Sequence, residues 1–439
     1  MAKRYPYDLS HYSFMSGKIG RLMTLSVIPV VAGDSMGINL AGAIRLSPLR
    51  RDLALDAMVD LFGFYVPHRH VYGDDWISFI QGGHDENVTL TSIPVGGTPP
   101  QYLGYNNLTG NVPAWLIHGY NMIWNRYFRV PNGQVAELPL ANDASSLQQT
   151  VEGLNFGQLC ARLKTLPTTG HRVVNSGTQE TDNPDNIYSA TVQGATARID
   201  LAELDRQRGR HKTELERHWF GRRYTDILER VYGGYASSDA DQRPTLLMRE
   251  SQWLSGYDVD GSADANLGQY AGKAASVMDM NIPGKFFPEH GALWLMALVR
   301  FPTIFEKEVH YLVRRNDPTY PEIAGDPDII ANRQPHTLFR QNLFTGVAST
   351  DTTSLGYHPF GQWYRYHPSV IHNRFDELSG FPFIPYVPAN HTAAQYHQGG
   401  DYDRVFATSQ LGHWRSQFRV NAMVKRVVPG PLSSIYTGV

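Results

Sequence analysis

Cysteines and long apolar runs are nearly missing from this chain of 439 residues. Cys160 is the only cysteine, and disulfides or cysteine-based zinc sites need pairs or quartets. We therefore expect packing alone to stabilise the fold. No apolar run approaches the roughly 20 residues that cross a bilayer, so we expect no membrane insertion. The N-terminal MAKRYPYDLS lacks the apolar core of a secretory signal, so we expect the chain to fold where it is made.

A strong excess of charge and the common catalytic motifs are missing as well. The formal net charge is −2, which excludes the global basic field of a dedicated nucleic-acid-binding domain but leaves room for local patches. The chain contains no Gly-x-Ser-x-Gly elbow, Walker A loop, dinucleotide fingerprint or His-Glu-x-x-His helix. Glu289 and His290 are adjacent, so on an extended chain they point to opposite faces. We expect neither an enzyme nor a cofactor.

Glycine, proline and aromatic residues are abundant, with 40 Gly, 27 Pro and 24 Tyr. This mixture favours strands joined by many irregular turns. Apolar stretches of strand length, bounded by Gly, Pro, Asp or Asn, lie at 22–31, 38–46, 59–66, 292–301, 363–366 and 418–428. The strands thus cluster early and again after about residue 245. We predict a mainly β fold, a barrel or sandwich whose connections carry long insertions.

Three segments have helical patterns. A short amphipathic turn is predicted at 74–80, and a second helix at 112–128. The third, at 201–232, has the clearest pattern, with an apolar stripe of Leu215, Trp219 and Leu228 and a Gly233-Gly234 stop.

His68 and His70 follow Pro67, where the strand at 59–66 should end. On an extended chain their i, i+2 spacing puts both side chains on one face, as in paired metal ligands. The alternative is that both imidazoles lie in a packed junction, and we favour it because the nearby sequence offers no third ligand. If the two histidines lie at a buried interface, protonation near pH 6 should loosen an assembly.

Asp258 and Asp260 resemble the start of a calcium loop, in which alternating carboxylates face one cation. The twelfth position should be Glu, but it is Gln269. An ordinary Asp-Gly turn at Asp260-Gly261 is the better interpretation.

The densest basic run falls in the predicted third helix. Arginines with nearby aromatics can bind phosphates and stack on unpaired bases. Glu and Asp alternate with them at i, i+4 spacing, which favours a solvated helix face instead. The candidate DNA contacts are Arg206, Arg208, Arg210, Lys212, Arg222 and Arg223.

Several short blocks carry a family resemblance. They include PVVAGDS, GAIRLSPLRR, FYVPHRHVYG, SGYDVDG, PEHG, ALVRFP, IAGDP, GQWYRY and GFPFI. In this order they resemble blocks of the major capsid protein, called F, of the Microviridae, which are small icosahedral bacteriophages with circular single-stranded DNA. The match is weakest between about residues 81 and 239.

The resemblance implies one domain over residues 1–439. Its fold would be the viral eight-stranded antiparallel jelly roll, with long inter-strand insertions, a few short helices and large insertions at 81–239. Sixty copies would form a T=1 shell around the DNA. Implied partners are a small basic DNA-packaging protein and scaffolding proteins. The resemblance does not decide whether spike and pilot proteins are also partners. The chain would lie in the virion, and in the bacterial host cytoplasm during assembly.

In that setting the His-Arg-His segment is a structural junction. The rival from another class is a jelly-roll carbohydrate-binding or hydrolytic protein, because the same architecture hosts lectins and enzymes.

Overall fold

The structure is a computed structural model of the whole chain. It describes residues 4–49, 55–82, 89–95, 102–104, 110–129, 137–138, 244–257, 273–314, 323–324, 336–358, 361–370, 372, 386–387, 389–392, 396, 402–406 and 412–428.

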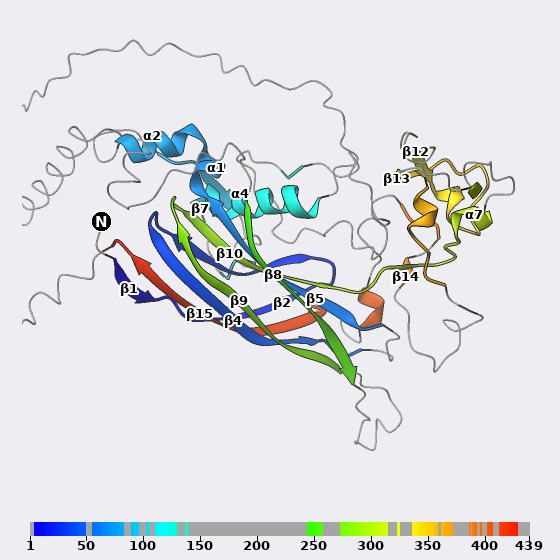
Figure 1. Cartoon of the computed structure of the whole chain (residues 1–439), viewed down its shortest axis with the longest axis horizontal. Helices are drawn as coiled ribbons and strands as arrows, with labels where there is room; N and C mark the ends of the chain where they lie inside the picture. Colours follow the sequence, from blue (N-terminus) through cyan, green and yellow to red (C-terminus); the bar gives the residue numbers. More distant parts are fainter. Residues whose placement is uncertain are drawn as a thin grey trace, which may run out of the picture.

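The main body is one antiparallel sheet, which confirms the mainly β prediction (Figure 1). Its strands are β1 (Tyr5–Asp8), β2 (His11–Gly17), β3 (Leu22–Val30), β4 (Asp34–Leu46), β5 (Ala57–Pro67), β8 (Thr245–Tyr257), β9 (Lys273–Phe287), β10 (Gly291–Arg300) and β15 (Trp414–Arg426). They pair in the order β1-β15-β4-β9-β8-β5-β10-β3, and β2 also pairs with β15.

The sheet folds over on itself at β8, which pairs with β5 along most of its length and with β9 only at Ser255–Tyr257. We call β1, β2, β15, β4 and β9 the open sheet, and β3, β10, β5 and β8 the covered sheet. At the other edge, Ser13 Oγ donates to the Leu25 carbonyl at 2.6 Å, which joins β2 to β3. The two sheets therefore enclose a core between them.

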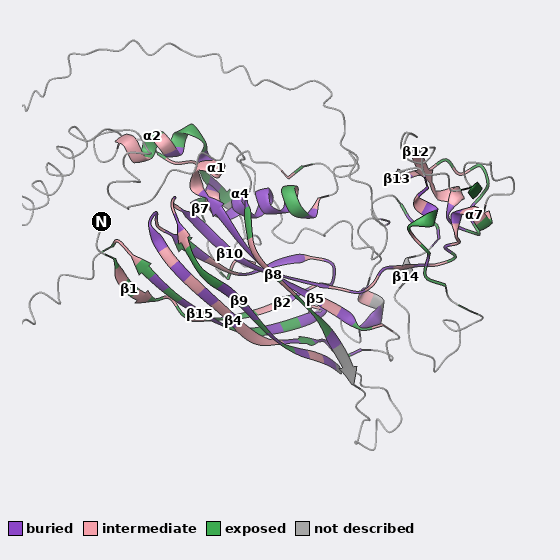
Figure 2. Cartoon of the chain, in the orientation of Figure 1, coloured by how far each residue is buried: buried purple, intermediate pink, exposed green. Residues whose placement is uncertain are grey.

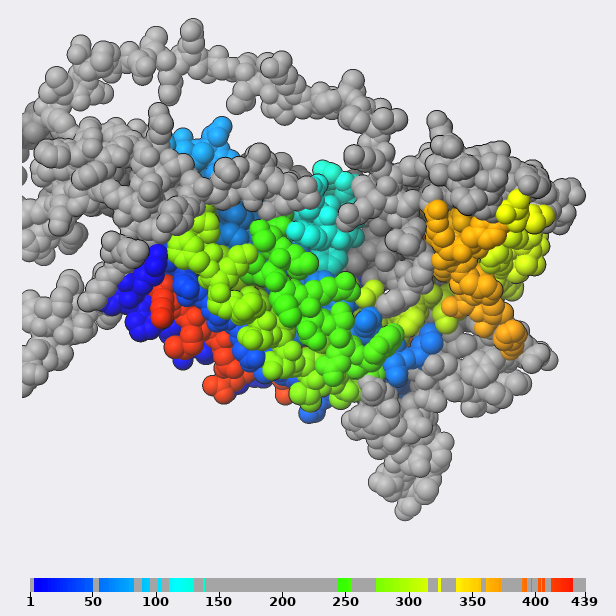
Figure 3. All heavy atoms as spheres, viewed as in Figure 1, coloured from blue at the N-terminus to red at the C-terminus, as the bar shows by residue number. Residues whose placement is uncertain are grey.

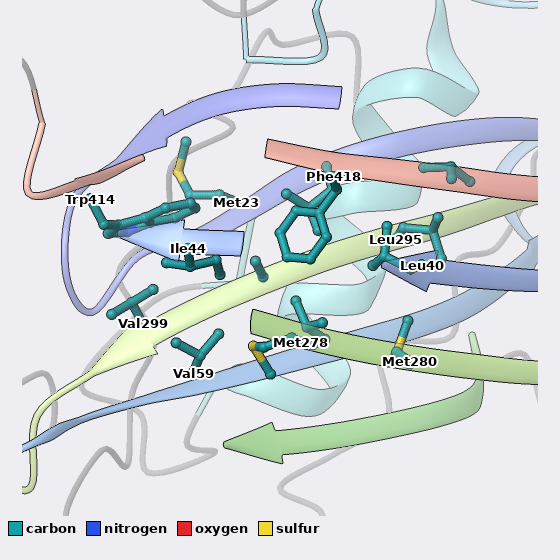
Figure 4. Close-up of a cluster of buried hydrophobic side chains, with 14 of the residues drawn as sticks. Met23, Leu40, Ile44, Val59, Met278, Met280, Leu295, Val299, Trp414 and Phe418 are labelled. Atoms are coloured by element: carbon teal, nitrogen blue, oxygen red, sulfur yellow. The ribbon is translucent and has the colours of Figure 1, made fainter. Parts of the chain in front are cut away.

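The core between the sheets forms because one side of every strand is apolar (Figure 4). In β15 the even-numbered residues from Trp414 to Val424 are buried, whereas most of the odd-numbered ones are exposed. This period of two is typical of a sheet with one face in solvent. Side chains from both sheets meet in this core, among them Met23, Leu40, Ile44, Val59, Met278, Leu295 and Phe418.

The covered sheet is buried on both faces. In β10 every residue from Gly291 to Val299 is buried, because odd positions face the first core and even positions such as Trp294 and Met296 face a second one. The second core is closed by α1 (His68–Tyr72), α2 (Asp74–Gly82) and α4 (Ala114–Ile123), which lie over this sheet (Figure 2). A two-stranded sheet of β6 (Ser92–Val95) and β7 (Gly110–Pro113) leads into α4.

Helix α4 approaches the covered sheet very closely at Gly119. A Cβ atom at this position would lie 2.8 Å from the Trp294 ring, which is fully buried. After α4 the chain continues as one π-helical turn, Trp124–Phe128. Phe128 packs edge-on against Phe62, with ring centroids 5.1 Å apart.

A smaller group of elements lies beyond one end of the main sheet (Figure 1). It has its own core around Phe305, Phe344 and Tyr396. The elements are β11 (Ile304–Phe305), α7 (Tyr311–Arg314), β12 (His336–Phe339), η3 (Arg340–Asn342), β13 (Ser354–His358), η4 (Gln362–Tyr364) and β14 (Tyr386–Val387). The turn η5 (Asp403–Val405) then leads back towards β15.

The predicted strands at 22–31, 38–46, 59–66, 292–301 and 418–428 are confirmed as β3, β4, β5, β10 and β15. The strand predicted at 363–366 is wrong. Gly361 has a left-handed φ of 79°, which starts a 3-10 turn, and Trp363 stacks on Tyr311 at 4.6 Å. Helix 74–80 is confirmed, and 112–128 is helical from Ala114 onward. Helix 201–232 lies outside the described residues. No helix in the described ranges is long and apolar enough to span a membrane.

Candidate nucleic-acid interface

The outer face of the open sheet lacks any covering layer among the described elements. In Figure 3 the segments of β9 and β15 lie at the visible surface. Because side chains alternate along each strand, this face carries the residues that the core does not use. Its residues are Tyr12, Phe14 and Ser16 of β2, Arg415, Gln417, Arg419, Met423 and Lys425 of β15, Ala41, Ala43 and Arg45 of β4, and Val277, Asp279 and Lys285 of β9.

Positive charge dominates this face. The exposed cations are Arg45, Lys285, Arg415, Arg419 and Lys425, whereas the exposed carboxylates of the same described strands are Asp8 and Asp279. Asp279 already accepts a 2.6 Å hydrogen bond from Asn39 Nδ2. The whole chain is slightly acidic, so the face is a local basic patch of the kind that attracts a polyanion.

Two aromatic residues stand out from the face. The side chains of Tyr12 and Phe14 are 66% and 73% exposed, and their rings are nearly parallel, with centroids 6.4 Å apart and planes 15° apart. In the strand register, Tyr12 lies opposite Arg419 and Phe14 opposite Gln417. The guanidinium carbon of Arg419 is 5.9 Å from the Tyr12 ring centroid, a cation–π distance.

Asp34 anchors one end of the open sheet. Its buried carboxylate accepts the Val31 amide and pairs with Arg426 Nε, both at 2.9 Å. Burial raises the pKa of Asp34 in spite of these two hydrogen bonds. Arg4 Nε donates to the Gly33 carbonyl at 2.9 Å. Arg4, just before β1, and Arg426, at the end of β15, thus hold the β3–β4 turn.

A second anchor joins the segment after β2 to η5 and to the residue before β15. The Ile19 amide donates to His413 Nδ1 at 3.1 Å, and His413 Nε2 lies 2.5 Å from Asp403 Oδ1. Lys18 Nζ pairs with the same carboxylate at 3.2 Å. Burial alone would raise the pKa of Asp403, but the hydrogen bonds from Lys18 and His413 outweigh it and lower this pKa.

The His68–His70 segment is helical rather than extended, because α1 begins directly after Pro67. Residues at i and i+2 of a helix do not face each other, so the paired-ligand geometry is wrong. The His68 ring packs against Trp76 at 4.9 Å and Trp115 at 5.3 Å. Arg69 Nε pairs with Glu289 at 2.9 Å. The favoured interpretation, a packed structural junction, is confirmed.

The same junction also includes His290. Burial lowers the pKa of both His68 and His290 to about 4, and for His68 the neighbouring His290 adds to the effect. A pKa of about 4 disfavours the protonation near pH 6 that we expected for histidines at a buried interface. His68 is half-buried against Trp76 and Trp115 of its own chain. Across the described ranges, no group of three or more His, Cys, Asp or Glu residues is placed to hold a metal ion.

The sequence analysis missed the residues of the open face. Its six DNA-contact candidates, Arg206, Arg208, Arg210, Lys212, Arg222 and Arg223, lie outside the described residues, as do Asp258 and Asp260. The available signal was in Trp414–Arg426, WRSQFRVNAMVKR, where Arg415, Arg419 and Lys425 alternate with buried apolar residues. On a strand, residues separated by an even number of positions point to the same face, so these three cations lie together.

Comparison with known proteins gives the assignment. The family model described as "Capsid protein (F protein)" matches residues 1–168 and 133–435. The chain belongs to this capsid protein family. Capsid protein F of Escherichia phage G4 is 39% identical over 442 residues, covering 99% of this chain and 98% of the relative. Capsid protein F of Enterobacteria phage phiK is 37% identical over 455 residues, with the same two coverages.

A member of the capsid protein F family is a structural protein of a bacteriophage, and not an enzyme. The resemblance to the Microviridae F proteins is thereby confirmed. Capsid protein VP1 of Chlamydia phage 1 is more distant, at 28% identity over 151 residues, which is 30% of this chain.

Proposed function

We propose that this chain is the shell-forming subunit of a T=1 icosahedral capsid, present in sixty copies around a circular single-stranded DNA genome. The observation that carries the proposal is the similarity to capsid proteins F over 99% of the chain. The same alignments cover 98% of each of these relatives.

The proposed fold is the viral eight-stranded jelly roll as a single domain, with residues 81–239 as insertions between strands. The strand order supports it. With β1 left out, the open sheet has the order β2-β15-β4-β9 and the covered sheet has the order β3-β10-β5-β8. Consecutive strands therefore alternate between the two sheets, except β5 and β8, which pair with each other in the covered sheet. Two four-stranded antiparallel sheets connected in this way are typical of a jelly roll.

The proposed orientation turns the open sheet towards the genome. The covered sheet carries α1, α2 and α4, which suit contacts with neighbouring copies and the particle exterior. The open sheet offers Arg415, Arg419 and Lys425 without a covering layer, and cations of this kind bind phosphates by releasing condensed counterions. The six arginine and lysine residues at 206–223 remain a second set of proposed DNA contacts.

The remaining parts of the proposal follow from the family. A small basic packaging protein would neutralise the rest of the phosphate charge, because the chain itself has a net charge of −2. Scaffolding proteins would guide assembly in the host cytoplasm, and spike and pilot proteins would complete the virion. The carbohydrate-binding or hydrolytic alternative loses its support, since the chain belongs to a family of capsid proteins.

The test is expression of the chain with the neighbouring genes of its phage, followed by sedimentation and negative-stain imaging. Closed icosahedral particles dominated by a 49.3 kDa chain are expected. A stable monomer or dimer, with no particles under these conditions, would contradict the proposal.

A further inference from the structure

We propose that Tyr12 and Phe14 form a stacking platform for unpaired bases, which makes the open sheet selective for single-stranded over duplex DNA. The inference rests on the proposed function, in which this face meets the genome. Tyr12 and Phe14 would distinguish single-stranded from duplex DNA, whereas cations alone bind the phosphates of both.

Strand β2 reverses the usual distribution of polar and apolar residues. Ser13, a polar residue, is buried under the sheet and donates to the Leu25 carbonyl, whereas its neighbours Tyr12 and Phe14 point to solvent. The hydrogen bond of the Ser13 hydroxyl holds this residue on the buried side of β2. The pairing of β2 with β15 is consistent with the same orientation. Single exposed apolar residues are ordinary, but two adjacent large rings at 66% and 73% exposure indicate a binding surface.

The geometry of the two rings suits a stacked base. They are nearly parallel, and their centroids are 6.4 Å apart. Bases in a stacked strand are spaced by about 3.4 Å, so the separation is close to two stacking steps. Every base has a π face that can stack on an aromatic ring, but only an unpaired base has that face free. Bases inside a duplex are covered by their neighbours and leave the platform unused.

The positive charge beside the two rings favours a nucleic acid as the ligand. Arg419 lies over Tyr12, and Arg415 lies two residues further along the same face from Gln417, the partner of Phe14. Cations beside aromatic rings match a ligand with phosphates beside bases. The same cations would repel a basic peptide such as a packaging protein, and they disfavour a second copy of this equally cationic face.

The experiment measures affinity of the purified full-length chain for an oligothymidine strand and for a duplex of equal length. The variant is Tyr12→Leu/Phe14→Leu, which keeps apolar bulk but removes both π faces. Tyr364→Leu, at an exposed aromatic residue 46% accessible in the smaller group of elements, is the matched control. Thermal unfolding of each variant checks the fold.

The expected result is a loss of roughly 10- to 100-fold in single-strand affinity for the double variant, because stacking contributes about 1–3 kcal/mol per base. Duplex affinity should stay unchanged, and Tyr364→Leu should behave as the unaltered chain. Equal single-strand affinities for the variant and the unaltered chain would overturn the proposal, and so would an equal loss on both DNAs. A variant that loses only self-association in sedimentation would assign the platform to a second copy and overturn it too.

Failure of this inference is distinguishable from failure of the capsid proposal. If the unaltered chain forms DNA-containing particles on co-expression but the variant binds single strands normally, only the stacking platform is rejected. If the unaltered chain forms no particles, the capsid proposal fails whatever the oligonucleotide affinities are.

Discussion

The guanidinium of Arg419 lies over the ring of Tyr12, with Cζ 5.9 Å from the ring centroid. The two residues are directly opposite in the β15–β2 register, and the alternation of both strands turns them outward together. The contact holds a cation and an aromatic ring side by side on the uncovered face of the open sheet. This pairing is the local basis of the proposed contact with single-stranded DNA.

The double change Arg415→Gln/Arg419→Gln should weaken single-stranded DNA binding and make it less dependent on salt. Each phosphate contact contributes roughly 0.7 to the slope of log affinity against log salt for single strands, so the slope should fall by about 1.4. Titrations at several salt concentrations measure it. Arg365→Gln, an exposed arginine of the smaller group of elements, is the control. An unaltered slope in the double variant would show that these arginines do not meet phosphate.

Acid should destabilise the chain through His68 and His290. The pKa of each is about 4 in the folded chain and 6.5 in the unfolded chain, so between these values the unfolded state binds more protons. Stability is therefore complete above pH 6.5 and falls as the pH decreases towards 4, by on the order of 3 kcal/mol for each histidine. Urea unfolding across this pH range measures the decline.

The variant His68→Phe keeps the aromatic contacts with Trp76 and Trp115 but cannot ionise. Its stability should decline less steeply with acid than that of the unaltered chain, whereas His372→Gln, at an exposed position, should leave the slope unchanged. A His68→Phe slope equal to that of the unaltered chain would contradict the account of the junction.

Gly119→Ala should destabilise the chain, although alanine is the better helix former by about 1 kcal/mol. The new Cβ would lie 2.8 Å from the Trp294 ring, which is fully buried and cannot move aside. Overpacking of this kind costs about 1–3 kcal/mol, so the net effect is a loss of about 1 kcal/mol. Gly284→Ala in β9, where no atom lies within 4 Å of the added Cβ, is the matched control. A higher unfolding midpoint for Gly119→Ala would contradict the packing described.

Asp60→Asn should strongly destabilise the main sheet, because it removes a buried charge that is paired. The carboxylate is 1% exposed and pairs with Arg300 Nε at 2.7 Å and Arg249 Nη2 at 3.0 Å. Removing one partner of a buried ion pair costs about 3–5 kcal/mol. Glu306→Gln, which removes a pair between a half-buried carboxylate and the exposed Lys307, should change stability by less than about 1 kcal/mol. Similar unfolding midpoints for the two variants would refute this assignment.

Strands with strong patterns could be predicted from the sequence. The continuous apolar run of β10 reflects burial on both faces, and the alternation of β4 reflects burial on one face. Both patterns can be recognised within a few neighbouring residues. Strand β9 was not predicted, because Pro283 and Gly284 interrupt its pattern, and its place beside β4 depends on distant pairing. Helix α1 was not predicted, because Pro67 suits either an extended exit or a helix start.

The open face could be predicted only in part. The sequence shows that Arg415 and Arg419 are four residues apart and therefore share a face of one strand. It does not show that β15 lies between β2 and β4. Tyr12 and Phe14 read as core residues, since apolar side chains on a strand usually face inward. Their exposure depends on Ser13 taking the buried side, which is a property of the assembled sheet.

A density map of particles from co-expression, at a resolution that traces strands, would show which way the open sheet faces. We expect a closed shell of this chain in which Tyr12, Phe14 and Arg419 of every copy face the interior, with nucleic-acid density against them. A shell whose open sheets face outward, or bury this face between neighbouring copies, would contradict the account.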